Sequence, residues 1–141
     1  MLTLKIYQQR TLDKLTAYLE RTRLLGEPAK AFAELWEAKG YSSIFRPLAG
    51  LESIPYVCLR LPTGGGKTLL SAYTVALATD AYIEADYPLV LWLVPTDAIR
   101  TQTLETLKNP RHPNREVLDD RFGGRVRVFD ITDFTQLRHQ D

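Results

Sequence analysis

The sequence predicts an α/β fold in which helices flank a parallel sheet and a helical element precedes it. Two short, mostly apolar runs at 56–61 and 89–94 have the continuous apolarity of strands buried on both faces of a sheet. Between them, a helix rich in leucine, alanine, tyrosine and valine is predicted from Lys67 to about residue 85. This alternation is typical of right-handed βαβ units.

The N-terminal part is predicted to be helical. Leucines recur at helical spacing over 7–25, and Gly26 followed by Pro28 is typical of a helix end. A second helix is expected over 29–39. Serine, glycine and proline residues predict a loop over 41–55.

The C-terminal part continues the alternation of elements. A helix is predicted over 96–107, with Thr96 able to cap it, followed by a proline-broken turn at 109–114. A third strand is expected over 125–129, and 132–140 has the pattern of a helix entering the next unit.

Composition excludes several classes of protein. The net charge of the 141 residues is +1, which gives no support for nucleic-acid binding by charge alone. One cysteine excludes a disulfide framework and a cysteine-rich zinc site. The longest apolar run is far too short to span a bilayer, and the N-terminus lacks a signal-peptide pattern. We therefore expect a cytoplasmic protein without membrane contact.

A glycine-rich loop between the first strand and the following helix carries the strongest functional signal. The glycines at 64–66 can adopt backbone angles that side chains forbid, and their N–H groups can cradle phosphate oxygens at a helix N-terminus. Lys67 can then reach the β- and γ-phosphates, and the Thr68 hydroxyl can bind magnesium. The general phosphate-loop pattern would need glycine at position 61, where this chain has Leu61.

The loop sequence Pro-Thr-Gly-Gly-Gly-Lys-Thr at 62–68 resembles motif I of superfamily-two helicases and translocases, which also lack the first glycine. The resemblance runs from about residue 5 to about residue 134 and is strongest to the type III restriction enzyme Res subunits. It implies the N-terminal part of a RecA-like, P-loop ATP-binding lobe at 55–141, preceded by a helical segment at 1–54 that carries a Tyr-Gln element.

The resemblance also implies the residues that bind ATP and magnesium. Lys67 would be the catalytic residue, and Thr68 would hold the magnesium ion. In the Tyr-Gln element, the Gln8 amide would read the adenine edge, because its donors and acceptor match adenine better than guanine. The complete nucleotide-binding set is Gln8, Thr63, Gly64, Gly65, Gly66, Lys67, Thr68 and Leu69.

A second segment resembles motif Ia of the same superfamily, which contacts the backbone of a nucleic-acid strand. Pro95 and Thr96 follow the second predicted strand, and Gln102 lies six residues after Thr96. The Thr96 hydroxyl and a helix N-terminus offer a phosphate site. Asp97 departs from the arginine that is frequent in the family, which removes one expected cationic contact. The implied partner is nucleic acid, with DNA favoured.

Motif II, an Asp-Glu run that would hold magnesium, is not found in the chain. Asp130 is the best internal substitute, but we favour a position after residue 141, together with the remaining helicase lobe or lobes. A modification or specificity subunit is a further partner that the resemblance implies. Nucleotide binding is therefore expected rather than turnover by this chain alone.

Two other interpretations stay open. One is a different P-loop enzyme, such as a nucleotide or small-molecule kinase, although Leu61 and the Pro-Thr pair at 95–96 speak against it. The other is a truncated, non-catalytic remnant that binds ATP or docks a partner, for which the missing motif II is the best support.

Overall fold

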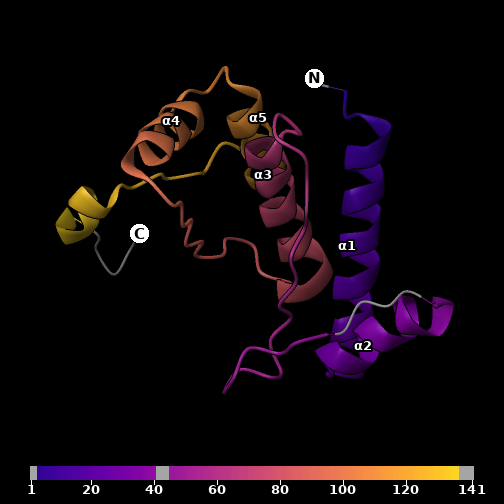
Figure 1. Cartoon of the computed structure of the whole chain (residues 1–141). Coiled ribbons are helices and arrows are strands. Elements are labelled where there is room, and N and C mark those ends of the chain that lie inside the picture. Colours follow the sequence, from indigo (N-terminus) through magenta and orange to yellow (C-terminus); the bar gives the residue numbers. More distant parts are fainter. Residues whose placement is uncertain (1–2, 41–44, 137–141) are drawn as a thin grey trace.

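The structure, a computed structural model, describes residues 3–40 and 45–136 (Figure 1). Four residues of the loop predicted at 41–55, and the end of the helix predicted at 132–140, lie outside these ranges. The helices are α1 (Ile6–Leu25), α2 (Pro28–Leu35), the 3₁₀ turn η1 (Glu37–Lys39), α3 (Lys67–Ala78), the π-helical turn η2 (Thr79–Ile83), α4 (Asp97–Lys108), α5 (Pro113–Phe122) and the 3₁₀ helix η3 (Ile131–Gln136).

The predicted parallel sheet is wrong, because the described part of the chain contains helices and no strand. The segments predicted as strands, at 56–61, 89–94 and 125–129, are irregular chain that joins the helices. Apolar β-branched runs favour strands, but a strand is stabilised by its neighbours in the sheet and by cover on both faces. None of these three segments pairs with a strand among the described residues, and each has exposed residues along its length.

The second segment is covered by other parts of the chain on one side only. Leu89, Leu91 and Leu93, which we call the leucine row, are 98%, 81% and 80% exposed. Trp92, on the opposite side of the segment, packs against the apolar core of the C-terminal helices. Helices therefore cover one side of this segment and leave the leucine row bare.

The helices predicted from periodicity are found close to their expected positions. Leu12, Leu15 and Leu19 of α1 are buried as their spacing predicts. Gly26 ends α1 with a φ of 69°, a left-handed conformation that glycine adopts without strain. The helix that follows the glycine loop is shorter than expected, because the α-helix gives way to the π-helical turn η2 after Ala78.

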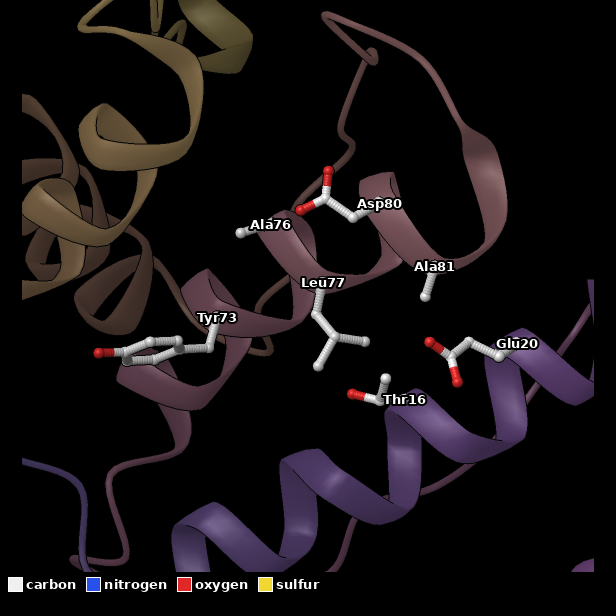
Figure 2. Close-up of a pocket in the computed structure, with 7 residues that line it drawn as sticks. All are labelled: Thr16, Glu20, Tyr73, Ala76, Leu77, Asp80 and Ala81. Carbon is white, nitrogen blue, oxygen red and sulfur yellow. The ribbon is translucent and has the colours of Figure 1, made fainter.

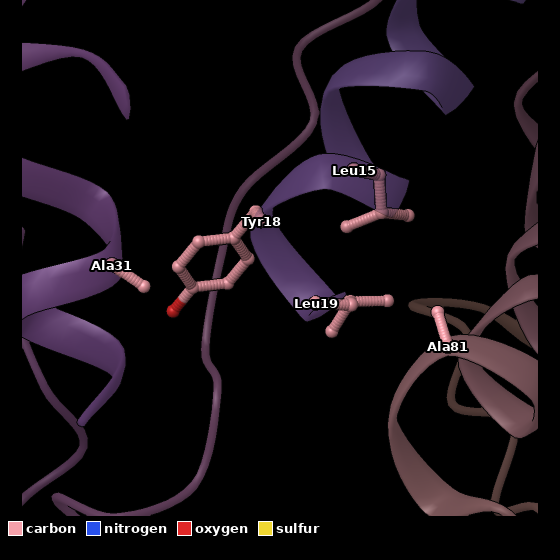
Figure 3. Packing of buried hydrophobic residues seen from close by; sticks show 5 residues of the cluster. All are labelled: Leu15, Tyr18, Leu19, Ala31 and Ala81. Carbon is pink, nitrogen blue, oxygen red and sulfur yellow. The ribbon is translucent and has the colours of Figure 1, made fainter. Parts of the chain in front are cut away.

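The first core cluster joins α1 to α2 and η2 (Figure 3). Leu15 and Leu19 of α1 approach Ala81, while the Tyr18 ring points toward Ala31 of α2. Tyr18 is fully buried, and its hydroxyl has no hydrogen-bond partner among the described residues. This burial raises the pKa of Tyr18, because the charged phenolate would be desolvated. The cluster fixes the position of α1.

The second core cluster joins α3, α4 and α5, and the helix α5 begins within the proline-broken turn predicted at 109–114. Its N-cap is His112, whose Nδ1 accepts a hydrogen bond from the Asn114 N–H at 3.1 Å. Pro113 occupies the first helical position and Gly123 ends the helix with a φ of 59°. Leu118 packs into the core against α3 and α4.

None of the helices in ranges 3–40 and 45–136 combines the length and apolarity that crossing a bilayer requires.

Candidate nucleotide-binding site

The glycine loop ends directly at the first residue of α3. Gly64 and Gly66 have φ values of 74° and 79°, in the left-handed region that glycine adopts without strain. The N–H of Gly65 donates to the carbonyl of Pro62 at 3.0 Å, which closes the loop as a tight turn. The backbone therefore requires glycine at 64 and 66.

The N-terminus of α3 faces this loop without a side-chain cap. Gly66 is the N-cap residue, and its carbonyl accepts the first helical hydrogen bond, from Leu70 N–H at 2.9 Å. Backbone N–H groups at an uncapped helix start, together with the helix dipole, favour an anion. Of the first-turn side chains, Lys67 is exposed, Thr68 is half-buried and Leu69 is buried.

Lys67 folds back over the loop. Its Nζ donates to the Pro62 carbonyl at 3.0 Å, the same oxygen that accepts from the Gly65 N–H. Thr63 is exposed in the turn before the glycines. An exposed ammonium group held beside an uncapped helix start can bind a polyanion with little rearrangement.

The structure brings the Tyr-Gln element of α1 to the loop, although 57 residues separate Gln8 from Gly65 in the sequence. The Nε2 of Gln8 donates to the Gly65 carbonyl at 3.0 Å, and the hydroxyl of Tyr7 donates to the same oxygen at 3.1 Å. Gln8 is only 6% exposed, and its Oε1 accepts from the Lys5 N–H at 2.9 Å. A Cβ on Gly66 would lie 2.6 Å from Gln8 Nε2. The loop and α1 are therefore in close contact.

This contact predicts different costs for two glycine substitutions. Gly64→Ala and Gly66→Ala both place a side chain on left-handed backbone, which costs about 1–2 kcal/mol. A methyl group at 64 meets nothing within 4 Å, whereas at 66 it displaces the buried Gln8 amide from its hydrogen bonds. We expect Gly66→Ala to lower the free energy of unfolding, measured in urea, by more than Gly64→Ala does.

A second substitution serves as the control for that comparison. In a Gln8→Ala background the obstructing amide is gone, so the two glycine variants should lose similar amounts of stability. Equal losses in the wild-type background would contradict the close packing of Gln8 on Gly66.

The residues that resemble motif Ia lie at the start of α4. Thr96 is the N-cap of α4, and its Oγ1 accepts from the Ile99 N–H at 3.3 Å. Pro95, Thr96 and Gln102 are exposed. In Figure 1, α4 and α1 lie on opposite sides of α3, so the structure does not bring these three residues to the Tyr-Gln element.

Asp130, the best internal substitute for a magnesium-binding carboxylate, is already bound within the C-terminal part. It forms an ion pair with Arg100 of α4, and its Oδ1 accepts from the Ile131 N–H at 2.7 Å. Hydrogen bonding from the Arg100 guanidinium lowers the pKa of Asp130. The carboxylate thus fastens the start of η3 to α4, away from the glycine loop in Figure 1.

Several cations at 108–127 form ion pairs or hydrogen bonds with other parts of the fold. Lys108 lies 3.6 Å from Asp133, and Arg121 pairs with Asp80 at 2.6 Å. Arg115 is bound on three sides by protein oxygens. The sequence signal for α5 is the pair Pro113 and Gly123, which has the start and stop pattern of a helix.

A hollow of about 400 Å³ lies elsewhere, between α1 and the end of α3 (Figure 2). Leu77 points into it toward Thr16 and Glu20 of α1, while the Asp80 carboxylate, which pairs with Arg121, lies at its edge. Its lining includes none of the residues predicted to bind nucleotide. The candidate site is therefore the surface of the glycine loop and not this hollow.

Comparison with known proteins gives one match. A family model described as the type III restriction enzyme res subunit matches residues 1–132. No curated protein and no solved structure matches the chain.

Proposed function

The chain belongs to the family of the type III restriction enzyme res subunit, a helicase-like family with an ATP-binding domain, and from this membership we propose that it is the ATP-binding N-terminal portion of an ATP-dependent DNA helicase or translocase. In this proposal residues 1–54 supply the element that reads the base, and residues 55–141 supply the phosphate loop. The remaining lobe of the enzyme and a modification or specificity subunit would be its protein partners.

The observation that carries the proposal is the meeting of three groups at one loop. The uncapped start of α3, the exposed Lys67 ammonium and the Tyr-Gln element of α1 all reach residues 62–66. Each group suits a different part of ATP: backbone N–H groups and a cation suit phosphates, and an amide suits a base edge. Family membership and this arrangement support the same ligand.

The residues fit magnesium only as a companion of the nucleotide. Thr68 offers one hydroxyl at the start of α3, and ranges 3–40 and 45–136 contain no cluster of three or more acidic, histidine or cysteine side chains that would hold a metal. Magnesium characteristically uses few protein ligands and the phosphate oxygens of a substrate. When bound, the ion would neutralise phosphate charge, with Thr68 as its ligand from this chain.

The Gln8 amide keeps the capacity to recognise adenine while it holds the loop. One Nε2 hydrogen and one Oε1 lone pair remain after its bonds to Gly65 and Lys5. A donor and an acceptor side by side match the edge of adenine and oppose guanine. We therefore propose that Gln8 discriminates ATP from GTP.

That role predicts a change in nucleotide preference. The wild-type chain should bind ATP more tightly than GTP, and Gln8→Ala should bring the ratio of the two dissociation constants close to one, measured by calorimetric titration with magnesium present. Gln9→Ala is the matched control, because Gln9 is exposed and its side chain donates to Asp13 of α1 instead of to the loop. An unchanged ratio in Gln8→Ala would refute the assignment.

We propose that the start of α4 contacts the nucleic acid. Pro95, Thr96 and Gln102 are exposed at or near the N-terminus of α4. The backbone N–H groups at this helix start suit a phosphate of a nucleic-acid strand. Because the Asp130 carboxylate is engaged by Arg100, we expect nucleotide binding rather than hydrolysis from this chain.

A further inference from the structure

The hydroxyl of Tyr7 and the amide of Gln8 donate to one oxygen, the carbonyl of Gly65. We propose that Tyr7 is a positioning residue of the phosphate loop, which sets the orientation of the peptide between Gly65 and Gly66 before any base is bound. This inference rests on the proposed function of the loop as a phosphate site.

The Gly65 carbonyl and the Gly66 N–H belong to one planar peptide unit. The described backbone contains no cis bond, so the carbonyl of Gly65 and the N–H of Gly66 point in opposite directions across their shared plane. Two donors on α1 hold that carbonyl toward α1. The Gly66 N–H is therefore directed away from α1, and no acceptor for it is found among the described residues.

The glycines on both sides of this peptide leave its orientation flexible. Glycine populates positive and negative φ about equally, so a peptide between two glycines turns over easily unless something holds it. Gly66 stands at a φ of 79° and Gly65 is buried. The two hydrogen bonds from Tyr7 and Gln8 restrain the orientation of this peptide. Both donors lie on α1, which the first core cluster holds in place.

The Tyr7 hydroxyl is the part of this restraint that can be removed cleanly. Its bond to Gly65 is the one that the structure gives it among the described residues, whereas Gln8 also bonds the start of α1. Tyr7→Phe keeps the ring, and with it any packing on a base or sugar. The variant therefore changes the hold on Gly65 and little else.

The experiment uses a ligand without a base, so that phosphate binding by the loop is measured separately from recognition of the base. Inorganic tripolyphosphate and ATP are titrated, with magnesium, into the full chain and into Tyr7→Phe. Because one of two hydrogen bonds on the carbonyl is lost, both dissociation constants should rise by a similar factor, about three- to tenfold. Tyr73→Phe is the control, since its half-buried ring lies on α3 and its hydroxyl has no partner among the described residues. Thermal unfolding of both variants checks that the chain stays folded.

The outcomes distinguish this inference from the proposed function. A Tyr7→Phe chain that loses ATP affinity but keeps tripolyphosphate affinity would overturn the inference, because the hydroxyl would then act on the nucleoside. A wild-type chain that binds ATP but not tripolyphosphate would overturn it as well, since the loop would not be set before the base binds. A wild-type chain that binds neither would overturn the proposed function itself.

Discussion

Replacing Lys67 with alanine is expected to weaken ATP binding by about ten- to a hundredfold, which corresponds to losing one charge-assisted contact to phosphate. Lys67 is exposed, and its side-chain ammonium group donates to the Pro62 carbonyl. Its removal should therefore change the free energy of unfolding by no more than about 0.5 kcal/mol. Calorimetric titration with ATP measures the first quantity, and urea unfolding measures the second.

The control for Lys67 is another exposed lysine that lies on a different helix. Lys30→Ala on α2 removes the same charge from the whole chain but leaves the loop intact. If both variants bound ATP as the wild-type chain does, Lys67 would have no part in phosphate binding. If both lost affinity equally, the effect would come from net charge and not from the loop.

Replacing Arg115 with alanine is expected to cost about 3 kcal/mol of folding stability, a large loss for a single site. The guanidinium, in a side chain only 13% exposed, bonds Asp119 Oδ1 at 2.7 Å and the carbonyls of Leu107 and Val126 at 3.0 Å each. Alanine leaves these acceptors without their donor, and the partly buried Asp119 carboxylate without its cation. Urea unfolding followed by circular dichroism gives the free energy difference.

Two control variants show whether the stability loss in Arg115→Ala comes from its three contacts. Arg111→Ala removes an exposed arginine just before α5 and should change stability by less than about 0.5 kcal/mol. Arg115→Lys keeps the charge but lacks the planar fork that reaches three acceptors, so its loss should be intermediate. A loss below about 1 kcal/mol in Arg115→Ala would show that the three contacts do not hold α5 in solution.

The helices could be predicted because their evidence is local. The leucine spacing of α1 and the glycine at its end are read within one helix, and the structure keeps both. The sheet could not be predicted reliably from the same kind of evidence. An apolar run at 89–94 reports a preference for extended, buried chain, whereas pairing depends on which other segments lie beside it. That information is not contained in the run itself.

The glycine loop could be located from its sequence, but its contacts could not be derived. Nothing in the spacing of Gln8 and Gly65 required the two to meet; the resemblance to a family suggested it, and the packing of α1 on α3 brings them together. Asp130 illustrates the opposite case. Its position after an apolar run suggested a metal ligand, yet Asp130 forms an ion pair with Arg100. No local sequence pattern indicates that this arginine lies beside it.

The exposed leucine row contributes little hydrophobic stabilisation to this chain. Fully burying a leucine side chain contributes about 1.5–3 kcal/mol, so three leucines that are 80–98% exposed forgo several kcal/mol of stabilisation. The total free energy of unfolding of an ordinary domain is only about 5–15 kcal/mol. Removing this one row from water would therefore add stabilisation comparable to a large part of that total.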